Sequence, residues 1–127
     1  MTTPANWRPA ARAKLVRLKS EAEAHRAESQ RLMQTCISMT QYLRTAEAEL
    51  AELERRLPFI KGEYADQIRQ EIEERTADVE QQRAALSAAR ERAEETRNAY
   101  GFAARLANDA TDAALRIRLV TEQEAAA

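Results

Sequence analysis

The chain has 127 residues, of which 44% are hydrophobic but only 5% are aromatic, and alanine supplies 27 of the hydrophobic positions. Alanine buries little surface, so this composition excludes a thick globular core, and the abundant Ala, Glu, Leu and Arg with only two glycines predict an elongated all-α unit. A net charge of −1 excludes a global attraction to nucleic acid or acidic lipid, so any electrostatic function requires local charge asymmetry.

The first nineteen residues are basic and include Trp7. Cations in the first turns of a helix oppose its dipole, so an anionic partner would explain them. The partner is nucleic acid, an acidic protein surface or the acidic C-terminal TEQEAAA of a neighbouring copy. No nucleic-acid-binding motif accompanies these charges, so nucleic acid is the less favoured partner. The candidate anion contacts are Arg8, Arg12, Lys14, Arg17 and Lys19.

A heptad pattern predicts the first long helix over about residues 9–57. Alternating steps of three and four residues, counted from Leu15, fall mostly on apolar residues and continue to Ile60 without a stutter. A strict seven-residue period in a helix of 3.6 residues per turn predicts left-handed supercoiling around a partner helix.

The segment LPFIKGEY, residues 57–64, predicts a tight turn at about 58–62. Pro58 removes an amide donor and disfavours the α conformation of Leu57, so the first helix is expected to end there. Gly62 readily takes the left-handed conformation that closes a helix. A flexible linker would be longer and less apolar. The sequence therefore predicts that the chain turns back on itself.

A second heptad series predicts the second helix over about residues 63–120. It runs from Ala65 to Ile117 and is richer in alanine than the first series. Gly101 marks either a close approach or a bend, and the segment NDATD at 108–112 is a second place where this helix could break. The predicted fold is a long antiparallel α-helical hairpin, a two-helix coiled coil, forming a single domain over residues 1–127.

The two series predict a register in which facing residue numbers add to 125. Large residues then face small ones in the half of the pairing farthest from the turn. The same register sets Arg75 against Leu50, where the long polar side chain has to extend outward. Two adjacent polar layers follow, and such layers fix a register at a cost in stability. These layers pair His25 with Tyr100 and Ser29 with Thr96.

Apolar residues outside the heptad seam gather at the end away from the turn. A two-helix hairpin cannot bury apolar groups on so many faces, so this end is expected to bundle with other copies or other proteins. The alternative is that these residues are scattered and exposed. The candidate interface comprises Trp7, Val16, Phe102, Leu106, Leu115, Leu119 and Val120.

The sequence carries no recognisable catalytic, metal or cofactor motif. His25 and Cys36 are the only histidine and cysteine, both are at seam positions, and neither glycine belongs to a phosphate-binding loop. We therefore expect no enzyme activity and no cofactor. The chain contains no apolar run of the ~18 residues that a membrane span needs and no apolar signal core, which predicts a location in the cytoplasm or in a particle assembled there.

These observations favour a structural or assembly protein, a hairpin subunit of a larger oligomeric complex. The alanine and arginine content is typical of GC-rich bacterial or phage genomes, so a phage virion component or a bacterial assembly component is expected. The alternative is a small coiled-coil binding module or chaperone that uses its basic start to contact nucleic acid or an acidic partner.

Overall fold

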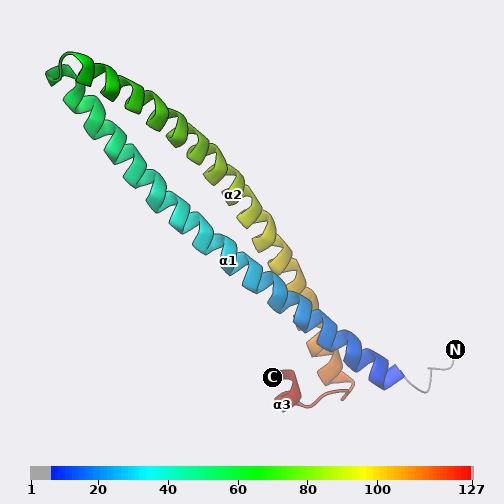
Figure 1. The fold of residues 1–127 in the computed structure, drawn as a ribbon. Helices are drawn as coiled ribbons and strands as arrows, with labels where there is room; N and C mark the ends of the chain where they lie inside the picture. The colour runs from blue at the N-terminus through cyan, green and yellow to red at the C-terminus, as the bar shows by residue number, and fades with distance from the viewer. Residues whose placement is uncertain (1–6, 127) are drawn as a thin grey trace. The chain divides into compact units, whose positions relative to one another are not determined.

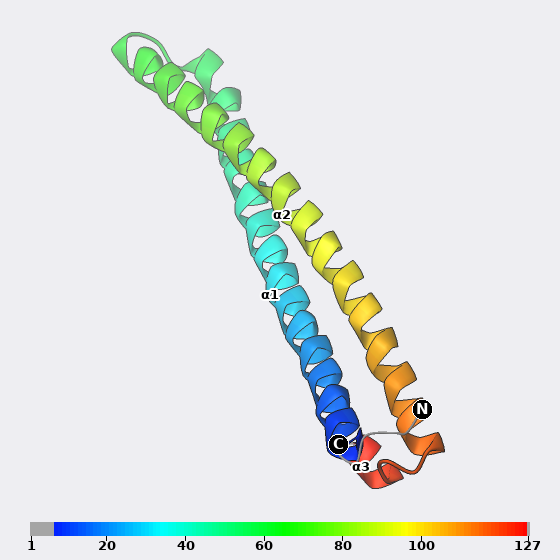
Figure 2. The ribbon, with the colours of Figure 1, turned by 90° about the vertical axis from the view of Figure 1, so that its right-hand side faces the viewer.

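The computed structural model describes residues 7–126 and shows an all-α helical hairpin. Its elements are α1 (Trp7–Arg56), the 3-10 helix η1 (Leu57–Phe59), α2 (Glu63–Arg116) and α3 (Glu122–Ala126). The two long helices pack against each other in antiparallel directions, joined by the turn drawn in green in Figures 1 and 2. The predicted fold class is confirmed.

The chain divides into two compact units. Unit 1 comprises Met1–Gln30 and Glu94–Ala127, and unit 2 comprises Arg31–Ala93. Each unit contains one segment of α1 and one of α2, and unit 1 also contains α3.

The heptad positions form the buried side of both long helices. From Leu15 to Ile60 every a and d position of the first series is buried or half-buried, with the exception of His25. The same holds for α2 from Ala65 to Ala114, whereas the last predicted position, Ile117, is 51% exposed. The helices are therefore amphipathic along the predicted stripe, and this stripe is what holds them together.

Each unit has its own hydrophobic core. In unit 2, Leu43, Val79 and Leu86 are buried together, and Met39 and Ala46 pack against them. This cluster contains both members of two predicted facing pairs, Met39 with Leu86 and Ala46 with Val79.

In unit 1 the core consists of Leu15, Ala114 and Leu119. One hollow of this unit is lined by Leu15 together with Ala110, which is again a predicted facing pair. Ala11 and Ala114 line the same hollow and continue that register by one layer. Both cores are thus compatible with the register read from the sequence.

The turn is formed by a 3-10 helix followed by a left-handed glycine. The amide of Ile60 donates to the Leu57 carbonyl oxygen at 3.1 Å, and the amide of Ala65 donates to the Gly62 carbonyl oxygen at 3.1 Å. Gly62 has φ +76°, a conformation that strongly favours glycine. Arg55 and Arg56 occupy the last turn of α1, where cations complement the negative end of the helix dipole.

Helix α2 continues without a break through Gly101 and Asn108 and ends at Arg116. A Cβ atom at Gly101 would meet no atom within 4 Å, so no close approach requires a glycine there. The sequence predicted an end of this helix near residue 120, whereas α2 ends at Arg116. Residues 117–120 are outside the helix because the chain turns at this point.

Candidate functional site

The end of α2 is closed by a Schellman motif that turns the chain back. Arg118 has φ 56° in the left-handed region. Its amide donates to the Leu115 carbonyl oxygen at 3.1 Å, while the amide of Leu119 donates to the Ala114 carbonyl oxygen at 2.9 Å. These are the two hydrogen bonds of the motif, and Leu119 and Ala114 also make its hydrophobic contact within the core of unit 1.

This turn explains one wrong expectation. The sequence indicates Leu119 as an interface residue because a helix extending to residue 120 would direct its side chain away from the seam. The chain leaves the helix before Leu119, however, and the side chain is only 3% exposed. Leu119 therefore belongs to the core of unit 1 and is removed from the candidate interface.

Two of the basic residues of α1 hold the C-terminal segment, residues 117–126. Arg12 donates from Nε and Nη2 to the Leu119 carbonyl oxygen, at 3.0 and 2.7 Å. Lys19 donates from Nζ to the Ala125 carbonyl oxygen at 2.8 Å. Both acceptors are backbone carbonyl groups, so these bonds do not depend on the side chains of the segment. Figure 2 shows α3 beside the start of α1.

The short helix α3 has a side-chain cap of its own. The amide of Glu124 donates to Thr121 Oγ1 at 3.2 Å, and the Thr121 hydroxyl lies 3.3 Å from Glu124 Oε1. Threonine followed three residues later by glutamate is the pattern of a capping box. The sequence reading missed α3, although TEQE at 121–124 carries this signal.

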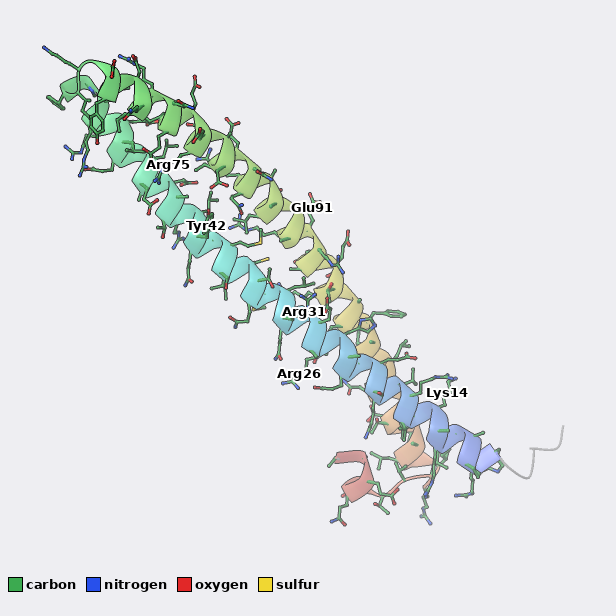
Figure 3. The ribbon with its side chains drawn as sticks, in the orientation of Figure 1. Lys14, Arg26, Arg31, Tyr42, Arg75 and Glu91 are labelled. Atoms are coloured by element: carbon green, nitrogen blue, oxygen red, sulfur yellow. The ribbon has the colours of Figure 1, made fainter. Side chains whose placement is uncertain are left out.

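The other basic residues of the predicted set lie in different surroundings. The Arg8 guanidinium lies 4.9 Å from the centre of the Trp7 ring, within the range of a cation–π contact. Arg17 forms an exposed ion pair with Glu21 at 3.9 Å. Lys14, labelled in Figure 3, is exposed. The five cations therefore do not form one uniform anion-binding patch, because Arg12 and Lys19 contact the chain's own carbonyl groups.

The seam of an antiparallel pair has two edges, one flanked by heptad positions e of both helices and the other by positions g. Counting from Leu15 as position a, Arg12 and Lys19 are e residues, so in unit 1 the C-terminal segment contacts α1 at the e edge.

In unit 1 the g edge carries two adjoining hollows that share Leu18. One is lined by residues that include Ala113 and Ile117, and the other by residues that include Phe102 and Leu106. We call these two hollows the apolar groove. Phe102 is 60% exposed, Ile117 51% and Leu106 43%. The sequence predicted Phe102 and Leu106 as interface residues, and the structure places both on this groove.

The remaining interface candidates are distributed over unit 1. Val16 is 65% exposed on α1. Trp7 and Val120 are half-buried and pack against the core of unit 1, and Leu115 is also half-buried.

Of the four residues of the predicted polar layers, three are half-buried and one is exposed. Ser29, Thr96 and Tyr100 lie partly within the seam, whereas His25 is exposed and lines the apolar groove. An imidazole is large and polar, so at a position beside the g edge it extends toward solvent instead of filling the seam.

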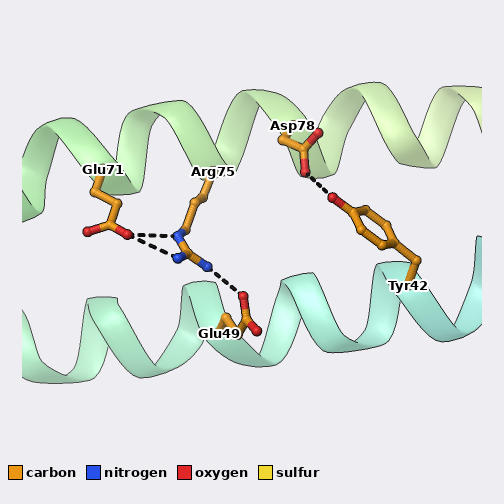
Figure 4. Close-up of polar contacts among 5 residues, drawn as sticks. All are labelled: Tyr42, Glu49, Glu71, Arg75 and Asp78. Carbon is orange, nitrogen blue, oxygen red and sulfur yellow. Dashed lines mark hydrogen bonds and ion pairs between the residues drawn. The ribbon is translucent and has the colours of Figure 1, made fainter.

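In unit 2 a polar cluster lies at the g edge (Figure 4). Arg75 donates to Glu49 across the two helices at 2.6 Å and to Glu71 on its own helix at 3.0 Å, and these bonds raise the pKa of its guanidinium. Tyr42 donates to Asp78 across the helices at 3.2 Å, and the charge of Asp78 raises the pKa of the phenol. Arg75, a seam residue by its heptad position, is half-buried, and its guanidinium reaches Glu49 at the g edge.

A second cross-helix pair joins Arg83 and Glu47 at 3.2 Å, and both are e residues. The charges of unit 2 therefore connect the two helices on both edges of the seam. Such exposed ion pairs add little to the free energy of folding, so their main effect is on how the two helices are placed against each other. We find that the polar cluster has the geometry of a structural contact.

Ligand chemistry of other kinds has little support among the described residues. Within residues 7–126, no three His, Cys, Asp or Glu side chains are grouped closely enough to hold a metal ion. Cys36 is half-buried and packs against the core of unit 2. Among the same residues, no helix combines the length and the apolar character that crossing a membrane requires.

Comparison with known proteins adds no assignment: no protein-family model, no curated protein and no solved structure matches this chain.

Proposed function

We propose that this chain is a non-enzymatic structural subunit, a coiled-coil hairpin that is built into a larger protein assembly through unit 1. The observation that carries the proposal is the apolar groove of that unit, on which three large apolar side chains stay exposed. On this groove Phe102 is 60% exposed, Ile117 51% and Leu106 43%. Exposed apolar groups that lie together on a small protein are typical of a protein–protein contact.

The exposed residues are not needed for the packing of the unit itself. Leu15, Ala114 and Leu119 already form a core in which each side chain is at most 6% exposed. Burying a large apolar side chain contributes roughly 1.5–3 kcal/mol, so a contact that covers several of them is sufficient to hold a partner.

The charges favour a protein partner over nucleic acid. A nucleic-acid surface requires several cations that are free to contact phosphates. Arg12 and Lys19 donate to carbonyl groups of the C-terminal segment, and Arg17 is paired with Glu21. Three of the five predicted anion contacts thus have partners within unit 1.

The proposed assembly contains further copies of this chain, other subunits, or both. The arginine-rich and alanine-rich composition supports a phage virion component or a bacterial assembly component, in the cytoplasm or in a particle assembled there.

The test is the mass of the purified chain in solution, measured by light scattering at about 0.05 M and about 1 M salt. An assembly held by apolar contacts keeps its mass at both salt concentrations, and this is the expected result. A monomer of 14.4 kDa that binds duplex DNA at the lower salt concentration only would instead establish the nucleic-acid-binding alternative.

A further inference from the structure

The two edges of unit 1 differ in what covers them. The C-terminal segment lies at the e edge and is held there by Arg12 and Lys19. The start of the same segment, Ile117 and Leu119, lines one hollow of the apolar groove at the g edge but does not close the groove. Phe102, Leu106 and Ile117 stay exposed on it. One covered edge and one open edge leave the unit one apolar groove. A single self-complementary surface produces a closed dimer, whereas two open edges would permit an open-ended assembly.

The charges beside the groove indicate the occupant. In unit 1, residue n of α1 is level with residue 125 − n of α2, as for Leu15 and Ala110, which line the same hollow. Three charged residues of α1, Lys14, Arg17 and Glu21, are level with charges of opposite sign on α2. The match along the helices is within one residue of this register. These α2 residues are, in the same order, Asp112, Asp109 and Arg105.

The level charges do not meet within one chain. Asp109 is at heptad position c and Asp112 and Arg105 are at position f, all of which face away from the seam. Arg17 is instead paired with Glu21 on its own helix. No ion pair joins the two sets of charges within the part of the chain that the structure describes.

We propose that the apolar groove of unit 1 binds the same groove of a second copy of this chain, in a two-fold dimer whose axis runs along the helices. This inference rests on the proposed function and names the partner of its contact surface. Rotation about such an axis does not shift a residue along the helices, so equivalent residues of the two copies are level. It sets α1 of one copy beside α2 of the other, and these two helices run antiparallel. The level charges then become neighbours between copies, so Arg17 of each copy meets Asp109 of the other.

The same arrangement buries the exposed side chains of the groove. Phe102 and Leu106 of α2 pack against the α1 side of the second groove, where Leu18 lies. The result in unit 1 is four long-helix segments, each antiparallel to its neighbours, which is a common packing for helix bundles. Electrostatic complementarity selects this orientation, and apolar burial supplies most of the affinity.

The first test places a charge in the groove. Phe102→Glu is expected to raise the dissociation constant of the dimer at least ~10-fold, because a carboxylate replaces a central apolar contact. The matched control is Phe59→Glu, since Phe59 is 82% exposed at the turn in unit 2. Sedimentation equilibrium should show the control as a dimer of the 14.4 kDa chain. A Phe102→Glu chain that dimerises as tightly as the control overturns the proposal.

The second test uses charge reversal and is specific to the orientation. Arg17→Glu alone sets two carboxylates against each other at both contacts of the dimer, and Asp109→Arg alone sets two cations there. Each variant alone is expected to dimerise at least ~10-fold more weakly than the unmodified chain. In an equimolar mixture both contacts regain opposite charges, so we expect heterodimers that are tighter than either homodimer.

The outcomes separate this inference from the proposed function. One outcome is a salt-resistant assembly whose dissociation constant is changed neither by Phe102→Glu nor by mixing the charge variants. In that case the groove inference is wrong and the proposed function stands. If the unmodified chain is monomeric and binds only DNA, the proposed function is wrong as well. Circular dichroism of every variant checks that the helices are intact.

Discussion

The two glycines of the chain occupy opposite backbone conformations, which makes their substitutions a matched pair. Gly62 has φ +76°, whereas Gly101 lies within α2, and a Cβ atom added at either residue would meet no atom within 4 Å. Substitution effects at both sites are therefore governed by the backbone and not by packing.

Gly62→Ala is expected to lower the free energy of unfolding by about 1–2 kcal/mol, because alanine is strained in the left-handed region. Gly101→Ala is expected to raise the same quantity by up to ~1 kcal/mol, because alanine is the better helix former and loses less backbone entropy. Urea unfolding followed by circular dichroism measures both. Equal effects of the two substitutions would contradict the assigned turn.

Glu52 is a carboxyl group whose pKa is lowered by two neighbouring arginines. It accepts hydrogen bonds from Arg55 at 2.6 and 3.0 Å and from Arg56 at 2.8 Å. These bonds, that to Arg55 first, lower the pKa of Glu52 from 4.5 to about 2. All three residues lie on one face of the last turns of α1.

The sign of the pH dependence follows from the lowered pKa of Glu52. The unfolded chain binds this proton near pH 4.5 and the folded chain only near pH 2, so the contribution to stability is complete above pH 4.5 and is lost as the pH falls to about 2. Carbon NMR of the carboxyl group should show titration near pH 2. In Arg55→Gln/Arg56→Gln the titration is expected to move up toward 4.5, and an unmoved midpoint would rule out the arginines as its cause.

At the scale of elements, the C-terminal segment depends on Arg12 and Lys19. Their replacement by methionine retains an apolar stem and removes the donors to the Leu119 and Ala125 carbonyl oxygens. We expect amide hydrogen exchange within residues 117–126 to become at least ~10-fold faster, since local opening then breaks fewer bonds. Arg17→Met is the control, because the ion pair of Arg17 is with Glu21 on its own helix. If exchange in the control became faster by the same factor, the result would contradict the prediction that Arg12 and Lys19 hold the segment.

The register of the helices is testable with a single introduced thiol. Cys36 packs against the core of unit 2, and the register places Ala89 opposite it. Ala89→Cys is expected to form an intramolecular disulfide with Cys36 on mild oxidation, because facing seam positions are close enough for the bond. Ala88→Cys, at an exposed position next to it, is the control and should not. Thiols of the Ala89→Cys chain that link only between molecules would show that the register is wrong.

The sequence predicted the long elements well because their signal is repeated. Each heptad restates which face is apolar, so a chance residue such as Arg75 in the seam does not hide the pattern. The turn carried two strong local signals, Pro58 and Gly62, and the structure places a 3-10 helix and a left-handed residue there.

The end of the chain was harder to predict because its signals are single and weak. The left-handed residue that ends α2 is Arg118 and not a glycine or asparagine, so no residue type marked the stop. The capping pattern of α3 covers four residues, and its position against α1 depends on Arg12 and Lys19, more than a hundred residues away. A contact between such distant residues has no local signature. The apolar groove follows from this end, which leaves one edge of unit 1 uncovered.

At the scale of the whole molecule, the two units differ in the residues at their g positions. In unit 2 these positions hold Tyr42, Glu49 and Asp78, which connect α1 and α2 through hydrogen bonds and ion pairs. In unit 1 the corresponding α2 positions hold Ala99, Leu106 and other apolar residues. Contacts to another molecule are thus expected to stabilise unit 1 and to leave unit 2 as it is in the single chain.

This difference predicts how stability depends on protein concentration. If unit 1 dimerises, unfolding separates two chains, and each tenfold rise in concentration adds about 1.4 kcal/mol of stability per dimer. For a complex of two such chains the midpoint of thermal unfolding is expected to rise by roughly 3–5 °C per tenfold increase. Scanning calorimetry over a hundredfold range of concentration measures the shift.

The variant Phe102→Glu supplies the internal check of this prediction. It weakens the apolar contact of the groove, so its unfolding midpoint is expected to depend less on concentration at the low end of the range, while Phe59→Glu should keep the full dependence. Hydrogen exchange measured at low and at high protein concentration locates the dimer interface. At high concentration, amides of residues 94–117 should exchange more slowly, and those of residues 31–93 should be unchanged. Protection gained instead in unit 2 would move the interface there, since only the contacting helices lose the openings through which their amides exchange.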